Sequence, residues 1–135
     1  MKVLFLCTGN SCRSQMAEAI INSRWGDQWQ AFSAGTKPAG YVHPMAKQVL
    51  SEIGIEHRGH SKLADEFRDV QFDQVVTVCG SAAEECPVWL GEGKRIHHSF
   101  PDPAQTNDIK EFRAVRNAIE KEIIELLQYH DPSRI

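Results

Sequence analysis

The sequence predicts an α/β fold, a three-layer sandwich around a four-stranded parallel sheet. Short apolar, β-branched runs alternate with longer segments whose apolar residues recur at helical spacing. Two of these runs, VLFLC and VVTVC, end in a cysteine, at Cys7 and Cys79. Because the carboxyl ends of parallel strands share one edge of a sheet, and ligands of such sheets bind there, this edge is the expected site of function.

Local patterns define each expected element. Strands are expected at residues 3–7, 30–34 and 74–79, and a less apolar run predicts a fourth at 95–100. Helices are expected at 14–25, 43–53 and 108–128, with one short turn at 65–67. The buried face of the first helix is expected to contain Met16, Ala19, Ile20 and Ser23, and that of the last Phe112, Val115, Ile119, Ile123 and Leu126.

Bulk composition excludes several classes of protein. A chain of 135 residues suits one domain spanning 1–135. A net charge of −3 gives no argument for binding nucleic acid or an anionic membrane surface. The first apolar run is too short for a signal peptide or a membrane span, so a cytoplasmic protein is expected. Four cysteines in a reducing compartment indicate chemistry or metal binding before structural disulfides.

The loop after the first strand carries the strongest signal. It reads CTGNSCRS, a cysteine followed by five residues, an arginine and a serine. Backbone N–H groups of such a loop, at a helix N-terminus, form a cradle for an anion, and Arg13 adds a charged fork for two of its oxygens. The same positive field favours the thiolate of Cys7. The expected oxyanion-binding residues around this nucleophile are Thr8, Gly9, Asn10, Ser11, Cys12, Arg13 and Ser14. The alternative is that Cys7 is only a small core residue at the end of a strand.

The stretch CTGNSCRSQMAE resembles the signature loop of the low-molecular-weight protein tyrosine phosphatase fold, and it is most similar to the arsenate reductases built on that fold. The resemblance covers essentially the whole chain. Phosphatases of this fold typically have a proline after the loop serine, where this chain has Gln15.

Asp102, in FPDPA, follows the last expected strand. The resemblance implies that Asp102 is the general acid, which protonates the oxygen that leaves the central atom. The alternative is an ordinary turn aspartate between two prolines. The phosphatase branch usually has aromatic residues after this Asp-Pro pair, whereas residues 104–106 contain none, which favours a small inorganic substrate such as arsenate.

Cys79 and Cys86 suggest a thiol relay. If the first and third strands are neighbours, Cys79 reaches Cys7 after a modest loop movement. Cys86 is too far along a helix to bond Cys79, but Pro87 limits that helix to about one turn, so it is able to melt. The hypothesis is a relay in which Cys7 attacks arsenate, Cys79 attacks Cys7 and Cys86 attacks Cys79. The resemblance implies thioredoxin as the external reductant; a glutaredoxin system is the alternative.

Other interpretations use the same residues. A true phosphatase needs only Cys7, Arg13 and Asp102, and a non-enzymatic redox sensor would form the same disulfides with an oxidant. A zinc site is a further rival, although its spacing fits no common zinc pattern. Its candidate ligands are Cys79, Cys86, His97 and His98. No metal or cofactor is expected, and nothing indicates an obligate interface, so a monomer is expected.

The resemblance also implies supporting residues. Asn10 braces the loop, and Glu18, with Ser33 as a further candidate, corresponds to part of a potassium site beneath it. That site also uses an aspartate, whose position falls on Lys62 in this chain. The ammonium of Lys62 is therefore expected to replace the potassium charge, with a solvated surface lysine as the alternative. Cys12 is expected to serve loop packing; the alternative, which the resemblance to phosphatases of this fold implies, is a protective disulfide with Cys7.

Overall fold

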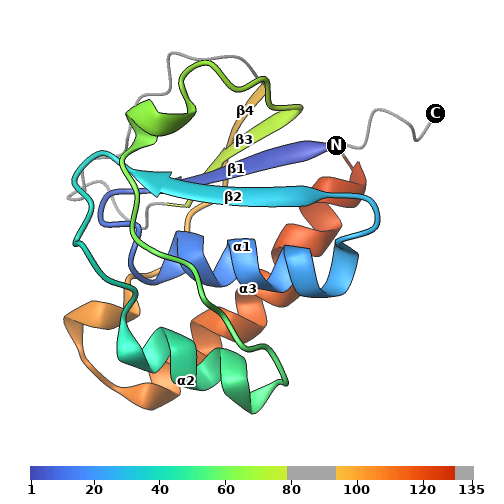
Figure 1. The fold of residues 1–135 in the computed structure, drawn as a ribbon. Helices are drawn as coiled ribbons and strands as arrows, with labels where there is room; N and C mark the ends of the chain where they lie inside the picture. Colours follow the sequence, from blue (N-terminus) through green and yellow to red (C-terminus); the bar gives the residue numbers. More distant parts are fainter. Residues whose placement is uncertain (79–93, 130–135) are drawn as a thin grey trace.

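The computed structural model describes residues 1–78 and 94–129. Strands are β1 (Lys2–Cys7), β2 (Gln30–Gly35), β3 (Gln74–Thr77) and β4 (Lys94–His97), and α-helices are α1 (Arg13–Trp25), α2 (Pro44–Glu52) and α3 (Ile109–Tyr129). Two short 3₁₀ helices, η1 (Ala64–Phe67) and η2 (Pro103–Gln105), lie in the connections (Figure 1). Helices and strands alternate in the order that the sequence predicts.

The four strands form one parallel sheet in the order β2-β1-β3-β4. The first and third strands are therefore neighbours, as the relay hypothesis requires. Their register pairs Val3 with Gln74 and Leu6 with Thr77, and the backbone N–H of Val78 donates to the carbonyl of Leu6 at 2.8 Å. Cys79, the next residue along the chain, lies outside the described residues.

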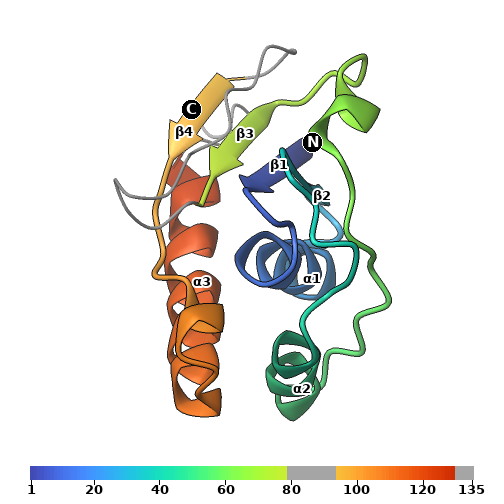
Figure 2. The same ribbon diagram turned by 90° about the vertical axis from the view of Figure 1, so that its left-hand side faces the viewer.

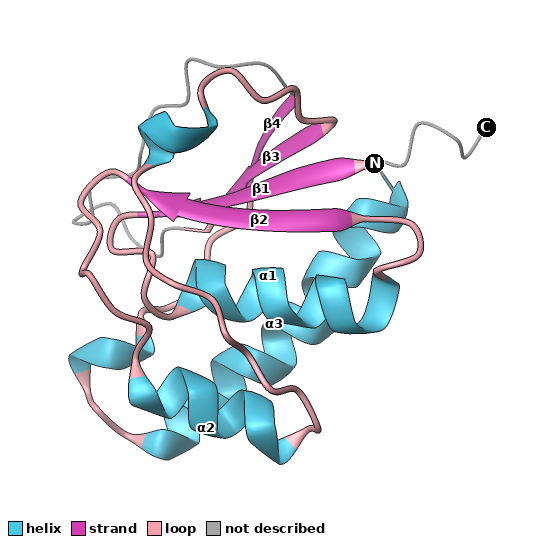
Figure 3. Ribbon diagram, in the orientation of Figure 1, coloured by secondary structure: helices cyan, strands magenta, loops and turns pink. Residues whose placement is uncertain are grey.

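All three α-helices lie on one face of the sheet (Figures 2 and 3). α1 packs against the strands and α3, while α2 packs on α1 and α3 farther from the sheet. The opposite face is a smaller apolar cluster that includes Leu4, Leu6 and Phe72, covered by residues of η1 and its flanks such as Phe67. The predicted fold class is confirmed. In the described residues, 1–78 and 94–129, the three layers are the α-helices, the sheet and this η1 segment.

Two predicted core residues are wrong. Ser23 is exposed, because residues 13–21 of α1 are the ones buried under the sheet and the last turn extends beyond it. In α3, Leu127 and not Leu126 continues the buried face, because the face advances in steps of four residues from Val115 onward. Leu126 is half-buried at the flank.

The fourth strand also ends earlier than expected. It stops at His97, and the chain continues past the end of β3, where Phe100 is buried and donates its N–H to the carbonyl of Val78 at 3.3 Å. This course places Asp102 in the same pocket as Cys7, the last residue of β1. Among the helices that the structure describes, none is both long and apolar enough to cross a membrane.

Candidate functional site

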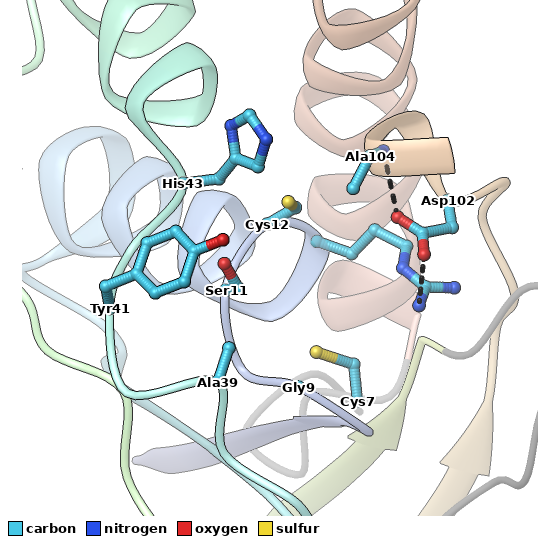
Figure 4. Close-up of a pocket in the computed structure, with 10 residues that line it drawn as sticks. Cys7, Gly9, Ser11, Cys12, Ala39, Tyr41, His43, Asp102 and Ala104 are labelled. Carbon is cyan, nitrogen blue, oxygen red and sulfur yellow. Dashed lines mark hydrogen bonds and ion pairs between the residues drawn. The ribbon is translucent and has the colours of Figure 1, made fainter. Parts of the chain in front are cut away.

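A small pocket opens where β1 ends and α1 begins (Figure 4). Its volume is about 180 Å³, below the roughly 300–1,000 Å³ of sites for drug-sized ligands, which suits a small anion. The residues that line it are Cys7, Gly9, Ser11, Cys12, Arg13, Ala39, Tyr41, His43, Asp102 and Ala104. Six of the residues that the sequence predicts for the site are among them; Thr8, Asn10 and Ser14 are not.

Cys7 is the last residue of β1, and its sulfur receives hydrogen bonds from the loop. The Cys7 Sγ lies 2.9 Å from the Ser14 Oγ and accepts the backbone N–H of Asn10 at 3.2 Å. The side-chain Nδ2 of Asn10 donates to the Ser14 Oγ at 2.8 Å. Because that hydroxyl already accepts from Asn10, its own proton is available to the sulfur, which stabilises a thiolate.

Arg13 supplies a permanent positive charge beside Cys7. Its guanidinium is almost fully buried and donates from Nη1 to the carbonyls of Val78 at 3.4 Å and Phe100 at 3.2 Å. These carbonyls follow β3 and β4, so the ends of two further strands fix the guanidinium at the pocket wall. A fixed planar cation of this kind suits an oxyanion with two accessible oxygens.

Asp102 has two contacts, one typical of a turn aspartate and one compatible with a general acid in the pocket. Its Oδ1 accepts the backbone N–H of Ala104 at 3.0 Å and so caps η2, as a turn aspartate does. Its Oδ2 lies 3.9 Å from the Arg13 Nη2, and the side chain lines the pocket opposite Tyr41 (Figure 4). A carboxyl group and a guanidinium therefore face the same small volume as the Cys7 sulfur.

Cys12 lines the same pocket as Cys7, but its thiol is held in the protonated form. It is buried, and desolvation followed by the nearby Asp102 charge raises the pKa of its thiol to about 12. Cys12 is therefore a protonated thiol at neutral pH, which makes it a poor nucleophile.

A second segment, residues 35–43, supports the loop and was not anticipated. A Cβ on Gly35 would lie 2.4 Å from the Thr8 carbonyl oxygen, so only glycine permits this approach. Ala39 and His43 donate their backbone N–H groups to the carbonyls of Gly9 and Ser11 at 2.9 and 3.0 Å. The one feature of the sequence that could have indicated this contact is Gly35, a glycine at the end of a strand.

Tyr41 corrects part of the substrate argument. It lines the pocket from this same segment, on the side opposite Asp102, and the residue is 56% exposed (Figure 4). The absence of aromatic residues at 104–106 therefore does not leave the pocket without one. The sequence offered no local signal, because Tyr41 is far along the chain from both Cys7 and Asp102.

The histidines of the rival zinc site do not converge. The Nδ1 of His97 lies 2.6 Å from the Thr77 Oγ1 on β3, whereas the Nε2 of His98 lies 2.9 Å from the Glu122 Oε1 on α3. The other two candidate ligands, Cys79 and Cys86, are outside the described residues. Within the described part, no group of three or more His, Cys, Asp or Glu side chains is placed to hold a metal ion.

The fold and the site define a protein of the low-molecular-weight phosphatase class. Residues 2–132 match the family described as low molecular weight phosphotyrosine protein phosphatase, and the chain belongs to that family.

Within the family, the chain is similar to several arsenate reductases. The chain is 42% identical to arsenate reductase from Halalkalibacterium halodurans over 127 residues, which cover 90% of this chain and 91% of the relative. The crystal structure of arsenate reductase from Archaeoglobus fulgidus is similar with a TM-score of 0.77 at 33% identity, over 93% of this chain and 98% of that one. A thioredoxin-dependent arsenate reductase from Corynebacterium glutamicum is similar with a TM-score of 0.72 at 28% identity, over 98% of this chain and 62% of that one.

The potassium site implied by the resemblance does not fit the residues present. The Lys62 Nζ lies 3.8 Å from the Glu18 Oε1 and donates to the His60 carbonyl at 2.7 Å, and the Lys62 side chain is only 11% exposed. An ammonium therefore stands where the site requires a carboxylate. Burial raises the pKa of Glu18, and the Lys62 charge is the largest opposing influence.

We expect the protein to be indifferent to potassium. Exchanging sodium for potassium at constant ionic strength should leave both the rate of arsenate reduction and the melting temperature unchanged, because Lys62 already neutralises Glu18. A large activation specific to potassium would contradict this assignment.

His57 gives the fold a defined sensitivity to acid. Burial, followed by the charges of Lys62 and Lys47, lowers the pKa of His57 from 6.5 to about 4. Between these values the unfolded chain binds a proton that the folded chain does not, so stability falls as the pH drops through this window, by up to about 3 kcal/mol. Urea unfolding at neutral pH and at pH about 4 should show a smaller acid loss in His57→Gln than in the unsubstituted protein; equal losses would contradict it.

Proposed function

We propose that this protein reduces arsenate to arsenite with a three-cysteine relay and that thioredoxin regenerates it. The observation that carries the proposal is the small pocket in which Cys7 and Arg13 face the same volume. A tetrahedral oxyanion is the ligand that such a loop and guanidinium recognise. The relatives at about 42% identity are arsenate reductases, and this supports arsenate as the oxyanion.

The first step forms a sulfur–arsenic bond. The Cys7 thiolate attacks the arsenic of arsenate, while Arg13 and the loop N–H groups hold the oxygens. One oxygen leaves as hydroxide, and Asp102 supplies the proton that converts it to water. The Ser14 hydroxyl, 2.9 Å from the sulfur, keeps Cys7 in its thiolate form before attack.

The second and third steps transfer electrons among thiols. The thiolate of Cys79 attacks the Cys7 sulfur, and the sulfur–arsenic bond breaks with its electron pair remaining on arsenic, which leaves as arsenite. Cys86 then attacks Cys79, which frees Cys7 and leaves a Cys79–Cys86 disulfide. A dithiol of thioredoxin reduces this disulfide by exchange. The adjacency of β1 and β3 supports the approach of Cys79 to Cys7.

A second candidate function is phosphomonoester hydrolysis. Phosphate and arsenate are nearly the same shape, so the same loop cannot strongly exclude phosphate. Tyr41 favours this candidate, because an exposed ring at the pocket wall can contact an aryl ester. Hydrolysis requires neither Cys79 nor Cys86, and a redox sensor requires no Asp102, so variants of these residues separate the three functions.

Three properties of the whole protein belong to this proposal. The chain acts as one domain, as a monomer and in the cytoplasm, where thioredoxin keeps thiols reduced. Neither nucleic acid nor a membrane takes part, in keeping with a net charge of −3.

Asp102→Asn tests the acid step. The amide retains the cap on Ala104 through its oxygen but cannot give up a proton, so the rate of arsenite formation should fall by about 10²- to 10⁴-fold. Alkylation of Cys7 by iodoacetamide should remain possible. A rate equal to that of the unsubstituted protein would remove Asp102 from the chemistry.

A coupled assay tests the function as a whole. Thioredoxin, its reductase and NADPH are mixed with the protein, and NADPH oxidation is followed after addition of arsenate or phosphate. Oxidation that depends on arsenate and releases arsenite supports the proposal. Hydrolysis of an aryl phosphate with no arsenate-dependent oxidation would favour the phosphatase.

A further inference from the structure

Residues 57–62, which we call the strap, run behind the anion loop on the side away from the pocket. The Ser61 Oγ donates to the carbonyl of Gly9 at 3.1 Å, and the backbone N–H of Lys62 donates to the Asn10 Oδ1 at 2.8 Å. The strap lies about fifty residues from the loop in sequence. Its contacts with the loop are therefore tertiary, and no residue of the strap itself lines the pocket.

Gln15 connects the strap to the loop. It is fully buried on α1, and its Nε2 donates to the carbonyl of His60 at 2.9 Å and to the Asn10 Oδ1 at 3.0 Å. Its Oε1 lies 2.7 Å from the His57 Nε2. Since an amide oxygen only accepts, His57 carries a proton on Nε2 and donates it to Gln15.

The direction of these hydrogen bonds continues to the reactive sulfur. Asn10 adopts a left-handed backbone with φ of 47°, a conformation that needs support in a residue other than glycine. Because its Oδ1 accepts from both Gln15 and the Lys62 backbone, its Nδ2 must face the Ser14 Oγ. Ser14 therefore accepts from Asn10 and directs its own proton to Cys7.

Gly59 shows that the strap is fitted to this contact. A Cβ at Gly59 would lie 2.3 Å from the His57 Nε2 and 2.7 Å from the Gln15 Oε1. Any larger residue at this position therefore displaces the His57–Gln15 hydrogen bond. The close packing of Gly59 is a separate observation from the hydrogen bonds, and it involves the same two side chains, His57 and Gln15.

We propose that His57 and Gln15 are positioning residues for the Cys7 thiolate. The chain of donors runs from His57 to Gln15, then to Asn10 and Ser14, and ends on the Cys7 sulfur. Its effect is to make the Ser14 hydroxyl a donor to sulfur and to hold Asn10 in its left-handed conformation. The inference rests on the proposed function only in taking Cys7 as the reactive thiol, and its test uses no arsenate.

The experiment measures the rate at which iodoacetamide alkylates Cys7 as a function of pH, with the site assigned by peptide mass mapping. His57→Leu removes the donor to Gln15, whereas His57→Gln keeps an N–H donor at that position. Gly59→Ala displaces His57 by its Cβ without altering any polar group. His60→Leu is the matched control, because it removes an exposed histidine from the same strap and leaves its backbone carbonyl in place.

We expect His57→Leu and Gly59→Ala to move the pH midpoint of alkylation upward and to slow it by about 3- to 10-fold at neutral pH, since one charge-assisted hydrogen bond to sulfur is weakened. His57→Gln and His60→Leu should match the unsubstituted protein. Melting curves establish that each variant is folded. If His57→Leu does not fold, the test becomes the comparison of the pH midpoint of alkylation in Gly59→Ala with that in His57→Gln.

Two results would overturn the proposal. One is an unchanged midpoint in folded His57→Leu or Gly59→Ala. The other is a midpoint in His57→Gln that shifts as far as in His57→Leu. Failure of arsenate reduction in the coupled assay would leave this measurement intact, so the two proposals fail separately.

Discussion

Replacing Cys7 with serine is expected to abolish arsenite formation, with a loss on the order of 10³-fold or more. Serine fills nearly the same volume at the end of β1, but its hydroxyl is not ionised at neutral pH and does not form the sulfur–arsenic bond. The loop and Arg13 remain, so arsenate should still raise the melting temperature of the variant. The measurement is arsenite released per protein in the presence of the thioredoxin system.

Cys12→Ser is the matched control for this substitution. Cys12 lines the same pocket, but its thiol, with a pKa of about 12, is protonated at neutral pH. We expect Cys12→Ser to retain most of the activity. Arsenite formation by Cys7→Ser at a rate near that of the unsubstituted protein would show that the attack does not come from the end of β1.

Cys86→Ser is expected to separate a single turnover from steady cycling. The first two steps use only Cys7 and Cys79, so one equivalent of arsenite should appear in a burst. Further turnover should then fall by about 10²-fold or more, because thioredoxin would have to reduce a disulfide at Cys7, which is buried. Rapid-quench measurement of arsenite with substoichiometric enzyme resolves the burst from the steady rate.

Cys79→Ser provides the contrast. Without Cys79 nothing attacks Cys7, so the sulfur–arsenic adduct forms but no arsenite leaves, and the burst is absent. Unimpaired cycling in Cys86→Ser would exclude the relay and leave a mechanism in which an external thiol attacks Cys7 directly.

Contiguous signals explain what the sequence predicted well. The anion loop occupies residues 7–14, so the order of Cys7, Arg13 and Ser14 along the chain already specified their shared neighbourhood at a helix start. The alternation of strands and helices likewise rests on local patterns. Which strands are neighbours was left open by these local patterns, and the structure answers it by pairing β1 with β3.

Contacts between distant segments were not predictable in this way. Gly35 packs on the loop, Tyr41 lines the pocket and His57 contacts Gln15. Their segments carry no motif, and only the packed fold brings them to the site. Ser23 and Leu126 illustrate the other limit. Helical spacing leaves about one residue of freedom at each edge of a buried face, and neighbouring elements decide which residue is covered.

Gln15 shows how a difference from the phosphatase branch acquires a physical meaning. In sequence it marked only the absence of a proline after the loop serine. In the structure its amide donates to the His60 carbonyl and the Asn10 side chain, which a proline cannot do.

A relay of three thiols driven by arsenate leaves a defined disulfide, which non-reducing peptide mapping detects. Fully reduced protein is mixed with arsenate in the absence of oxygen and of any reductant, and the disulfides and the arsenite are then measured. The relay predicts one Cys79–Cys86 disulfide and one equivalent of arsenite for each protein. If all four cysteines remain free thiols, the relay is excluded.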